Sequence, residues 1–391
     1  MTKYNFDEVI DRKGTDCVKV DMLKEAFGRE DLMPLWVADM DFRTPDFIVE
    51  ALKERCKHEL FGYTFPSDDY YESITNWLLY KYNWKVEREW LHYIPGIVKG
   101  IAMALYCFTR PGDKVIIQPP VYHPFRLVPE SMEREVVNNP LKLVDGRYEM
   151  DFEQLESVID PQCKVLILCS PHNPGGVVWS KETLAKLAEI CVRHNILVIS
   201  DEIHSEMAYP QFKHHPFATV SEAAASCCIT FMAPSKTFNI AGIVTSYTVI
   251  PNPELREQFF RYLGAGEMAG GSLFSYEATR AAYTYGAEWL QQMRMYVMEN
   301  VNFVEKFLNT HIPQIKVYPP QASFLVWLDC RELGLSQRAL VTLFTEKAGL
   351  ALNDGVMFGR EGKGFMRLNV GCARSILDKA LNALKKAVDT K

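Results

Sequence analysis

The middle of the chain alternates short, continuously apolar runs with segments whose apolar positions follow a helical period. Five runs rich in β-branched residues end in polar or turn residues, and they span 113–122, 163–176, 196–204, 227–236 and 242–250. The segment KETLAKLAEICVRHN (181–195) instead places Leu184, Leu187 and Cys191 on one helical face, and Ser180 is suited to cap its start. Apolar strands separated by helices are typical of a parallel or mostly parallel sheet covered on both faces, so the pattern predicts an α/β fold.

The pattern of hydrophobic and polar positions changes after about residue 285. Amphipathic and apolar periods predict a helix at 287–311, a strand at 324–330, a helix at 336–349, a strand at 364–371 and a closing helix. Helices mixed with short strands indicate a separate, smaller α+β domain.

Length and composition agree with this organisation. The chain has 391 residues, of which 48% are hydrophobic and 24% are charged, which is enough for a large core and a second domain. We predict a large domain of residues 49–285 with a mixed, mostly parallel sheet, and a small α+β domain of residues 1–48 and 286–391.

The net charge and the N-terminal sequence argue against several classes of function. The net charge of −6 and the lack of Lys/Arg runs argue against nucleic-acid binding and against a membrane-surface patch. The first residues, MTKYNFDEVIDRKG, have no apolar segment typical of a secretory signal, and no apolar run reaches the length of a membrane span. A cytoplasmic protein is therefore expected.

The cysteines and histidines show no metal-site spacing. The ten cysteines are scattered, several lie inside apolar runs such as KVLILCS and CCITFM, and no C-x-x-C pair occurs. We therefore expect buried thiols in a reducing compartment, with no disulfide framework and no metal site. The adjacent pair His214-His215 is expected in a solvated loop.

Polar side chains follow the apolar runs at their ends: Tyr122, Asn173, Asp201, His204 and Lys236. In open α/β sheets, ligands bind beyond the carboxyl ends of the strands. Each residue also has an ordinary explanation, because a strand-end lysine is usually exposed and Asn or Asp often serves a turn or a cap. Their coincidence at one sheet edge favours a binding site.

The residue types at this edge suit pyridoxal phosphate. That cofactor needs an amine to bond to its aldehyde and a carboxylate to keep its pyridine nitrogen protonated, and the protein positions and tunes these groups. Lys236, in the turn APSKTF, could supply the amine, and Asp201 could supply the carboxylate.

The order of motifs resembles that of a known family. PPVYHPF, HNPGG, SDEIH, APSKTF and FMRLNVG resemble motifs of the fold-type I pyridoxal-phosphate enzymes of the aspartate aminotransferase superfamily, over nearly the whole chain. MPLWVADMDF, FGYTF, SDEIHSEM and GKGFMRLNVGCARS are similar to the cystathionine β-lyase or C–S lyase branch. The resemblance implies the fold of the pyridoxal-phosphate-dependent transferases.

The resemblance also implies roles at the cofactor ring. Lys236 would bind the cofactor covalently, and Asp201 would face the ring nitrogen. Tyr122 would stack on the ring, while Asn173 and His204 would lie near its phenolic oxygen, with Asn173 also close to the substrate.

Further roles implied by the resemblance concern the substrate and the partner subunit. Arg367 would hold the substrate carboxylate in a fork that lysine cannot reproduce. Trp36, with Val37 and Asp39, would line the substrate entrance. Tyr63 would act in catalysis and reach the phosphate from a neighbouring subunit, which implies a homodimer with shared active sites.

The phosphate needs a site of its own. The segment IPGIVKGIAMALYCF (94–108) reads as a glycine turn that opens a helix, where the amides of Ile97 and Val98 could hold an anion and Ser235 could add a hydroxyl. Two positions depart from many relatives, which have Ser at the place of Ala233 and Arg at the place of Val244.

The function that the resemblance implies is α,β-elimination from cystathionine or a related cysteine S-conjugate. The absence of an arginine in FGYTFPSDDYYES favours a hydrophobic thioether over a dicarboxylate. An aminotransferase that uses the same lysine, aspartate and arginine stays open as an alternative, although Val244 disfavours it. A regulatory role in binding a transcription factor is a third alternative.

Overall fold

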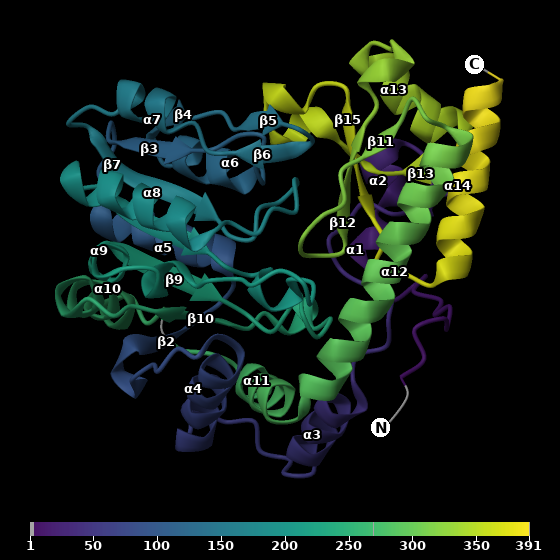
Figure 1. Cartoon of the computed structure of the whole chain (residues 1–391). Helices are drawn as coiled ribbons and strands as arrows, with labels where there is room; N and C mark the ends of the chain where they lie inside the picture. The colour runs from purple at the N-terminus through teal and green to yellow at the C-terminus, as the bar shows by residue number, and fades with distance from the viewer. Residues whose placement is uncertain (1–3, 269, 391) are drawn as a thin grey trace.

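The computed structural model describes residues 4–268 and 270–390, and a seven-stranded sheet forms its centre (Figure 1). The strands in spatial order are β2 (Leu91–Ile94), β10 (Ser246–Val249), β9 (Cys228–Met232), β8 (Leu197–Asp201), β7 (Cys163–Cys169), β3 (Lys114–Ile117) and β4 (Glu135–Asn138). Strand β10 is antiparallel to both neighbours, and the remaining adjacent pairs are parallel. The predicted α/β fold with a mixed, mostly parallel sheet is confirmed.

Helices cover both faces of this sheet because its strands alternate their apolar side chains. In β7, Val165 and Ile167 join one core cluster, whereas Leu166 and Leu168 join the other. Figure 1 shows α8 in front of the sheet and α5 behind it. The first cluster includes α5 (Ile97–Phe108), α6 (Pro124–Ser131) and α10 (Pro253–Ala265). The second includes α4 (Asp68–Tyr82), α8 (Lys181–Arg193), α9 (Glu222–Ser226) and α11 (Leu273–Tyr285).

Helix α8 shows how local sequence builds this arrangement. Ser180 caps the helix, since its hydroxyl accepts a hydrogen bond from the Thr183 amide at 3.1 Å. Leu184 and Leu187 are fully buried on the face that packs against the sheet. The helix connects the parallel strands β7 and β8, as such a crossover requires.

A second, smaller part is built on a four-stranded antiparallel sheet. Its strands in spatial order are β11 (Lys316–Val317), β12 (Leu325–Asp329), β15 (Phe365–Asn369) and β14 (Asn353–Asp354). Its helices are α12 (Ala287–His311), α13 (Gln337–Thr342), which continues as a π-helical turn over Leu343–Lys347, and α14 (Arg374–Asp389). The helix predicted at 287–311 is confirmed at both ends.

The N-terminal stretch joins this smaller part. Strand β1 (Met33–Pro34) pairs in parallel with β13 (Leu350–Ala351). This pairing supports a small domain made of both chain ends, while the boundaries at 48/49 and 285/286 stay a prediction. The remaining elements are α1 (Val18–Asp21), α2 (Leu23–Phe27), α3 (Asp46–Cys56), α7 (Phe152–Val158) and the hairpin of β5 (Lys142–Val144) and β6 (Arg147–Glu149).

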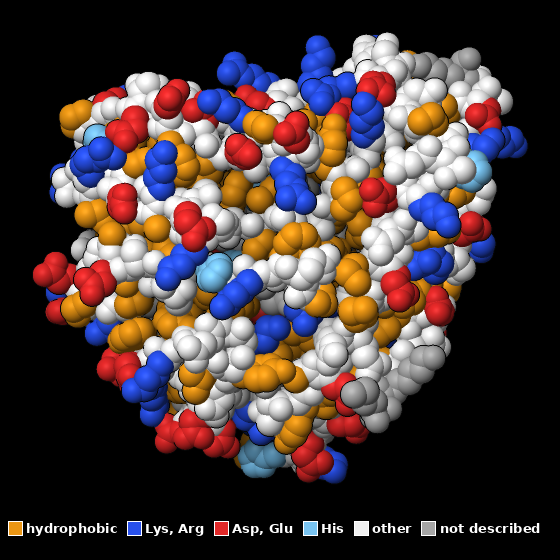
Figure 2. All heavy atoms as spheres, in the orientation of Figure 1, with side chains coloured by type: hydrophobic (Ala, Val, Ile, Leu, Met, Phe, Trp, Pro, Cys, Tyr) orange, Lys and Arg blue, Asp and Glu red, His pale blue; other side chains and the backbone are white. Residues whose placement is uncertain are grey.

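Figure 2 shows acidic and basic side chains mixed over one face of the molecule. Within residues 4–268 and 270–390, no helix is long and apolar enough to cross a membrane.

Candidate active site

A cavity of about 340 Å³ lies at the carboxyl ends of the parallel strands. Its walls contain most of the residues that the sequence analysis singled out: Tyr122, Asn173, Asp201, His204, Lys236, Ile97 and Val98. Asp201 is the last residue of β8, and Lys236 lies in the turn that follows β9. The residues predicted from the strand ends therefore meet in one cavity of the fold.

Lys236 lines the cavity with a half-buried side chain, and among the described residues its amine has one hydrogen-bond acceptor. Its Nζ donates to the carbonyl of Ala38 at 2.5 Å. Burial lowers the pKa of Lys236 to about 8, helped by the charge of Arg367 and opposed by those of Asp39 and Asp201. The ordinary explanation of an exposed strand-end lysine does not apply, because the side chain lines the cavity and its amine is lowered in pKa by burial.

Asp201 is a buried carboxylate to which no cation of the described residues is hydrogen-bonded. Its Oδ1 accepts from the Ile203 amide at 3.1 Å. Burial raises the pKa of Asp201 to about 7, although the Ile203 amide and the Lys236 charge act in the opposite direction. Because no cation of the described residues is bonded to it, this carboxylate can accept a hydrogen bond from a positively charged group of a ligand.

His204 completes the wall beside the lysine. Its Nδ1 is buried and has no hydrogen-bond partner within the part of the chain that the structure describes. Burial, with the charges of Lys236 and Arg367, lowers the pKa of His204 to about 3. The imidazole is therefore neutral at physiological pH and has a free hydrogen-bonding position.

Arg367 lies in β15 and is held in place by three oxygen atoms. Its Nη1 donates to Asn173 Oδ1 at 3.1 Å, and its Nη2 donates to Asn353 Oδ1 at 2.6 Å and to the Trp36 carbonyl at 3.1 Å. Its Nε is buried without a partner among the described residues, and burial lowers the pKa of Arg367 to about 10. The guanidinium keeps an unused donor and its charge, which suits recognition of a carboxylate.

The helix start predicted for an anion is present at one end of the cavity. Gly96, with φ +104, precedes α5 in a conformation that side chains disfavour, and Ile97 and Val98 form the first turn. The first amides of a helix have no acceptor within it, so they face the cavity as donors. Lys99, which the sequence analysis did not single out, lines the cavity and adds a cation.

Other predicted residues have different positions. Ser235 is buried but does not line the cavity. Trp36 contributes its carbonyl to Arg367, while its indole Nε1 donates to the Lys19 carbonyl at 2.9 Å and its ring packs against Phe27. Tyr63 is fully exposed on the single chain and does not line the cavity.

Residues 36–42, here called the strap, were only partly recognised from the sequence. Almost every carbonyl of the strap accepts a hydrogen bond from a side chain far away in the chain. The donors are Arg367 to residue 36, Asn369 to residue 37, Lys236 to residue 38, Lys19 and Asn369 to residue 39, Arg12 and Asn239 to residue 40, and Asn239 to residue 42. One of these donors, Lys236, lines the cavity together with Ala38 of the strap, so the strap forms part of the cavity wall. Arg367 does not line the cavity itself and is connected to it through Asn173.

A buried lysine, Lys19, is hydrogen-bonded to the strap. Lys19 is fully buried, and its Nζ donates to Asp41 Oδ2 at 2.8 Å and to the Asp39 carbonyl at 3.3 Å. Arg12 pairs with Asp39 and Asp41, each at 2.7 Å. No short sequence motif predicts this network, because its residues lie on different segments of the chain.

The expectation of a solvated His214-His215 loop is wrong for His214. Its ring is buried, and its Nε2 lies 2.7 Å from Glu202 Oε2. Glu202 also accepts from the Phe217 amide at 2.8 Å and from Ser200 Oγ at 2.9 Å. A buried glutamate needs such partners, and the sequence does not reveal where they fold.

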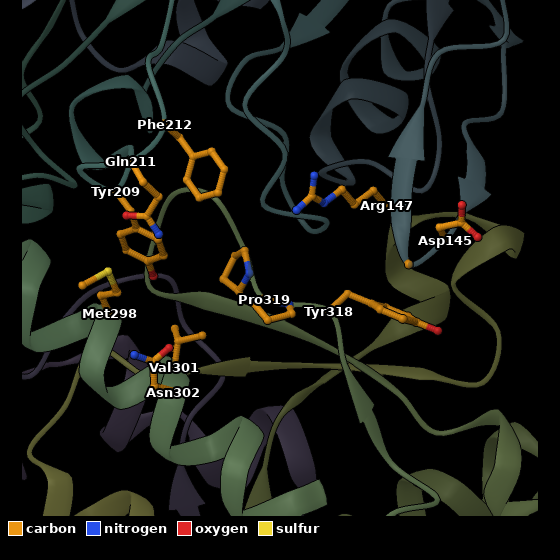
Figure 3. A pocket seen from close by; sticks show the side chains of 12 residues that line it. Asp145, Arg147, Tyr209, Gln211, Phe212, Met298, Val301, Asn302, Tyr318 and Pro319 are labelled. Carbon is orange, nitrogen blue, oxygen red and sulfur yellow. The ribbon is translucent and has the colours of Figure 1, made fainter.

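A separate cavity of about 250 Å³ lies between the β5–β6 hairpin and α12 (Figure 3). Arg147, Phe212, Met298 and Tyr318 line it. None of the site residues predicted from the sequence belongs to it. Among the described residues, no group of three or more His, Cys, Asp or Glu side chains could hold a metal ion.

Comparisons with known proteins agree with this geometry. A family model described as aminotransferase class I and II matches residues 30–384. Cystathionine beta-lyase PatB from Bacillus subtilis is 44% identical over 385 residues, which cover 98% of this chain and 100% of that protein.

Solved structures show the same fold. Cystalysin from Treponema denticola, which contains a pyridoxal 5'-phosphate cofactor, has a TM-score of 0.96 at 34% identity and covers 100% of both chains. A pyridoxal-phosphate-bound C–S lyase from Staphylococcus hominis has a TM-score of 0.92 at 33% identity, over 99% of this chain and 98% of that one. The resemblance drawn from the motifs is confirmed, and the chain belongs to the aminotransferase class I and II family of fold-type I enzymes.

Proposed function

We propose that the protein is a pyridoxal-phosphate-dependent C–S β-lyase that cleaves cystathionine or related cysteine S-conjugates to a thiol, pyruvate and ammonia. The observation that carries the proposal is the meeting of Lys236 and Asp201 in one buried cavity of about 340 Å³. The chain is also similar over nearly its whole length to a cystathionine β-lyase and to a C–S lyase.

The residues of the cavity fit pyridoxal phosphate. Among the residues that the structure describes, no cation is hydrogen-bonded to the buried carboxylate of Asp201, and the buried Nδ1 of His204 has no partner. These groups would hold the ring nitrogen and the phenolic oxygen, while the amides of Ile97 and Val98 would hold the phosphate. When bound, pyridoxal phosphate supplies an aldehyde carbon that bonds to amines and a ring that withdraws electrons from the substrate.

The side chains of this chain would carry the other tasks. Arg367 orients the substrate through its carboxylate, and Asn173 holds the guanidinium from the side. The Lys236 amine, with a pKa of about 8, is suited to take the proton from the substrate Cα, because a base works best when its pKa is near the working pH. The strap contacts this amine through the carbonyl of Ala38.

The overall reaction balances with water alone. The Cβ–S bond breaks, and the sulfur leaves with the bonding electrons and takes up a proton to become a thiol. The three-carbon remainder takes up one water and releases ammonia, which leaves pyruvate. No 2-oxo acid enters this balance, in contrast to transamination.

The dimer is part of the proposal. Tyr63 is fully exposed on the single chain, and Leu60, Phe61 and Phe65 beside it are also exposed. An exposed apolar loop of this kind is typical of a protein interface. We infer that a second copy covers this loop and that Tyr63 completes the active site of that copy.

One experiment separates the lyase from the aminotransferase. The purified holoenzyme is incubated with cystathionine, and pyruvate and ammonia are measured without any added 2-oxo acid. Continuous release of both supports the lyase. If turnover requires a 2-oxo acid and yields the corresponding amino acid, the enzyme is an aminotransferase.

A labelling experiment tests the lysine independently of turnover. Reduction of the holoenzyme with borohydride should fix the cofactor to the peptide that contains Lys236. Lys236→Ala should remove the label, whereas Lys99→Ala, which lines the same cavity, should keep it. A label on another lysine would overturn the assignment.

A further inference from the structure

Val244 contributes an apolar side chain to the end of the cavity that is proposed to hold the phosphate. It lines the cavity together with Gly96, Ile97 and Val98, at the start of α5. Its Cγ1 lies 3.9 Å from the position that a Cβ on Gly96 would take. The isopropyl group therefore packs against the glycine that precedes the first free amides of the helix.

The backbone of Val244 has a conformation that its side chain disfavours. Its φ of +56 and ψ of +62 lie in the left-handed region. Among the described non-glycine residues with positive φ, Val244 is the only one with a β-branched side chain. Glycine would adopt this conformation without steric cost, so a valine here is strained.

Hydrogen bonds hold this strained residue beside the helix start. Tyr93 Oη donates to the Val244 carbonyl at 2.8 Å, and the Val244 amide donates to the Ala241 carbonyl at 3.2 Å. The Gly96 amide in turn donates to Ser246 Oγ at 3.0 Å. Because β2 pairs with β10 at this end, the position of Val244 relative to Gly96 is fixed.

Core packing does not offset the strain at Val244. The residue is 40% exposed on the single chain, whereas the neighbouring β10 is buried. A strained backbone persists where the surrounding structure holds it, and such residues cluster at ligand sites. An isopropyl group brings no charge to an anion, but it does exclude water from the hydrogen bonds beside it, and such bonds are stronger where water is absent.

We propose that Val244 is a cofactor-retaining residue, whose isopropyl group shields the hydrogen bonds between the first amides of α5 and the phosphate of the cofactor. The inference rests on the proposed function, because it takes the phosphate to bind at Ile97 and Val98. Tyr93 acts through the Val244 carbonyl and is a positioning residue.

Binding of pyridoxal phosphate and of pyridoxal, which lacks the phosphoryl group, tests this role. Both are titrated into the full-length protein after removal of the cofactor. Val244→Gly should raise the Kd for pyridoxal phosphate about 5- to 10-fold and change that for pyridoxal less than about twofold. Val244→Ile keeps an apolar cover and should retain the wild-type Kd. Tyr93→Phe should raise the Kd for pyridoxal phosphate about 2- to 5-fold, because the Val244 carbonyl loses its donor.

Thermal unfolding measures the strain separately. Val244→Gly should raise the Tm of the cofactor-free protein by about 1–4 °C, although it weakens cofactor binding. The control Val9→Gly changes an exposed valine outside the cavity and should alter neither the Kd nor raise the Tm.

The outcomes distinguish this role from the proposed function. If Val244→Gly weakens both ligands equally or neither, Val244 does not shield the phosphate, and the lyase proposal stands. If the wild-type protein binds no pyridoxal phosphate and releases no pyruvate from cystathionine, the proposed function and the role of Val244 are both wrong.

Discussion

The amine of Lys236 donates a hydrogen bond to the carbonyl of Ala38 at 2.5 Å, across 198 positions of the chain. The residue proposed to bind the cofactor is thereby joined to the strap. Lys19, Arg12, Asn239 and Asn369 donate hydrogen bonds to other carbonyls of the strap. The position of the amine thus depends on a network that takes no direct part in the chemistry.

Lys19→Met should therefore destabilise the protein. Lys19 is fully buried, and its loss would leave Asp39 and Asp41 with Arg12 as their nearest cation. Breaking a buried ion pair on one side costs about 3 kcal/mol in the free energy of unfolding. Urea denaturation measures this loss. Lys24→Met, on the exposed side of the neighbouring helix, is the control, and equal stabilities of the two variants would show that the network is not needed.

Asp201→Asn should stabilise the cofactor-free protein at alkaline pH. Burial raises the pKa of Asp201 from the ordinary 3.8 to about 7, so between these values the folded protein holds a proton that the unfolded chain releases. Folding stability therefore falls as the pH rises through this window, and the loss is complete above it. The asparagine cannot ionise, so we expect a gain of roughly 2–4 kcal/mol at pH ~8 that disappears near pH ~4.

Glu202→Gln is the matched comparison for this effect. Glu202 is also buried, but it is bonded to Ser200, His214 and the Phe217 amide. Its substitution should lower stability by about 1–3 kcal/mol at pH ~8, because an amide group has one acceptor oxygen in place of two, so one of the buried partners loses its bond. A stability loss in both variants would mean that Asp201 has a cation partner that the geometry does not show.

Arg367→Lys should weaken the binding of every amino-acid substrate without changing the cofactor content. Lysine keeps the charge but cannot contact Asn173, Asn353 and a substrate carboxylate together. We expect kcat/KM to fall about 10- to 100-fold, chiefly through KM. Arg338→Lys, on the exposed surface, should have no effect. An unchanged KM in Arg367→Lys would place the carboxylate site elsewhere.

The shared active site can be tested by mixing two inactive variants. Tyr63→Ala should be inactive because the partner loses its tyrosine, and Lys236→Ala should be inactive because its own cavity loses the amine. After subunit exchange in equal amounts, half of the dimers are mixed, and one of their two sites has both residues, so about a quarter of wild-type activity should return. Activity that does not rise on mixing would show that Tyr63 acts within its own chain or not at all.

Much of the site could be predicted because it follows from short stretches of sequence. The β-branched runs that end at Asp201 and before Lys236 predict buried parallel strands, and buried parallel strands place their carboxyl ends at one edge. The same local logic predicts α12 from Ala287 to His311, since an amphipathic period over many turns has few alternatives. The short strands β2 and β4 have too few residues for a clear period, and they were not predicted.

The tertiary structure alone decided which distant residues meet. Lys19 in a one-turn helix has the sequence of an exposed lysine, yet it is fully buried because the strap brings Asp39 and Asp41 to it. Arg126 and Arg360 lie on different parts of the fold but line the same cavity, which is separate from the candidate active site. His214 contacts Glu202 inside the core. The sequence determines local periods and strand ends, since these depend on neighbouring residues. Burial and pairing of charges depend on which segments the fold brings together, so only the assembled chain determines them.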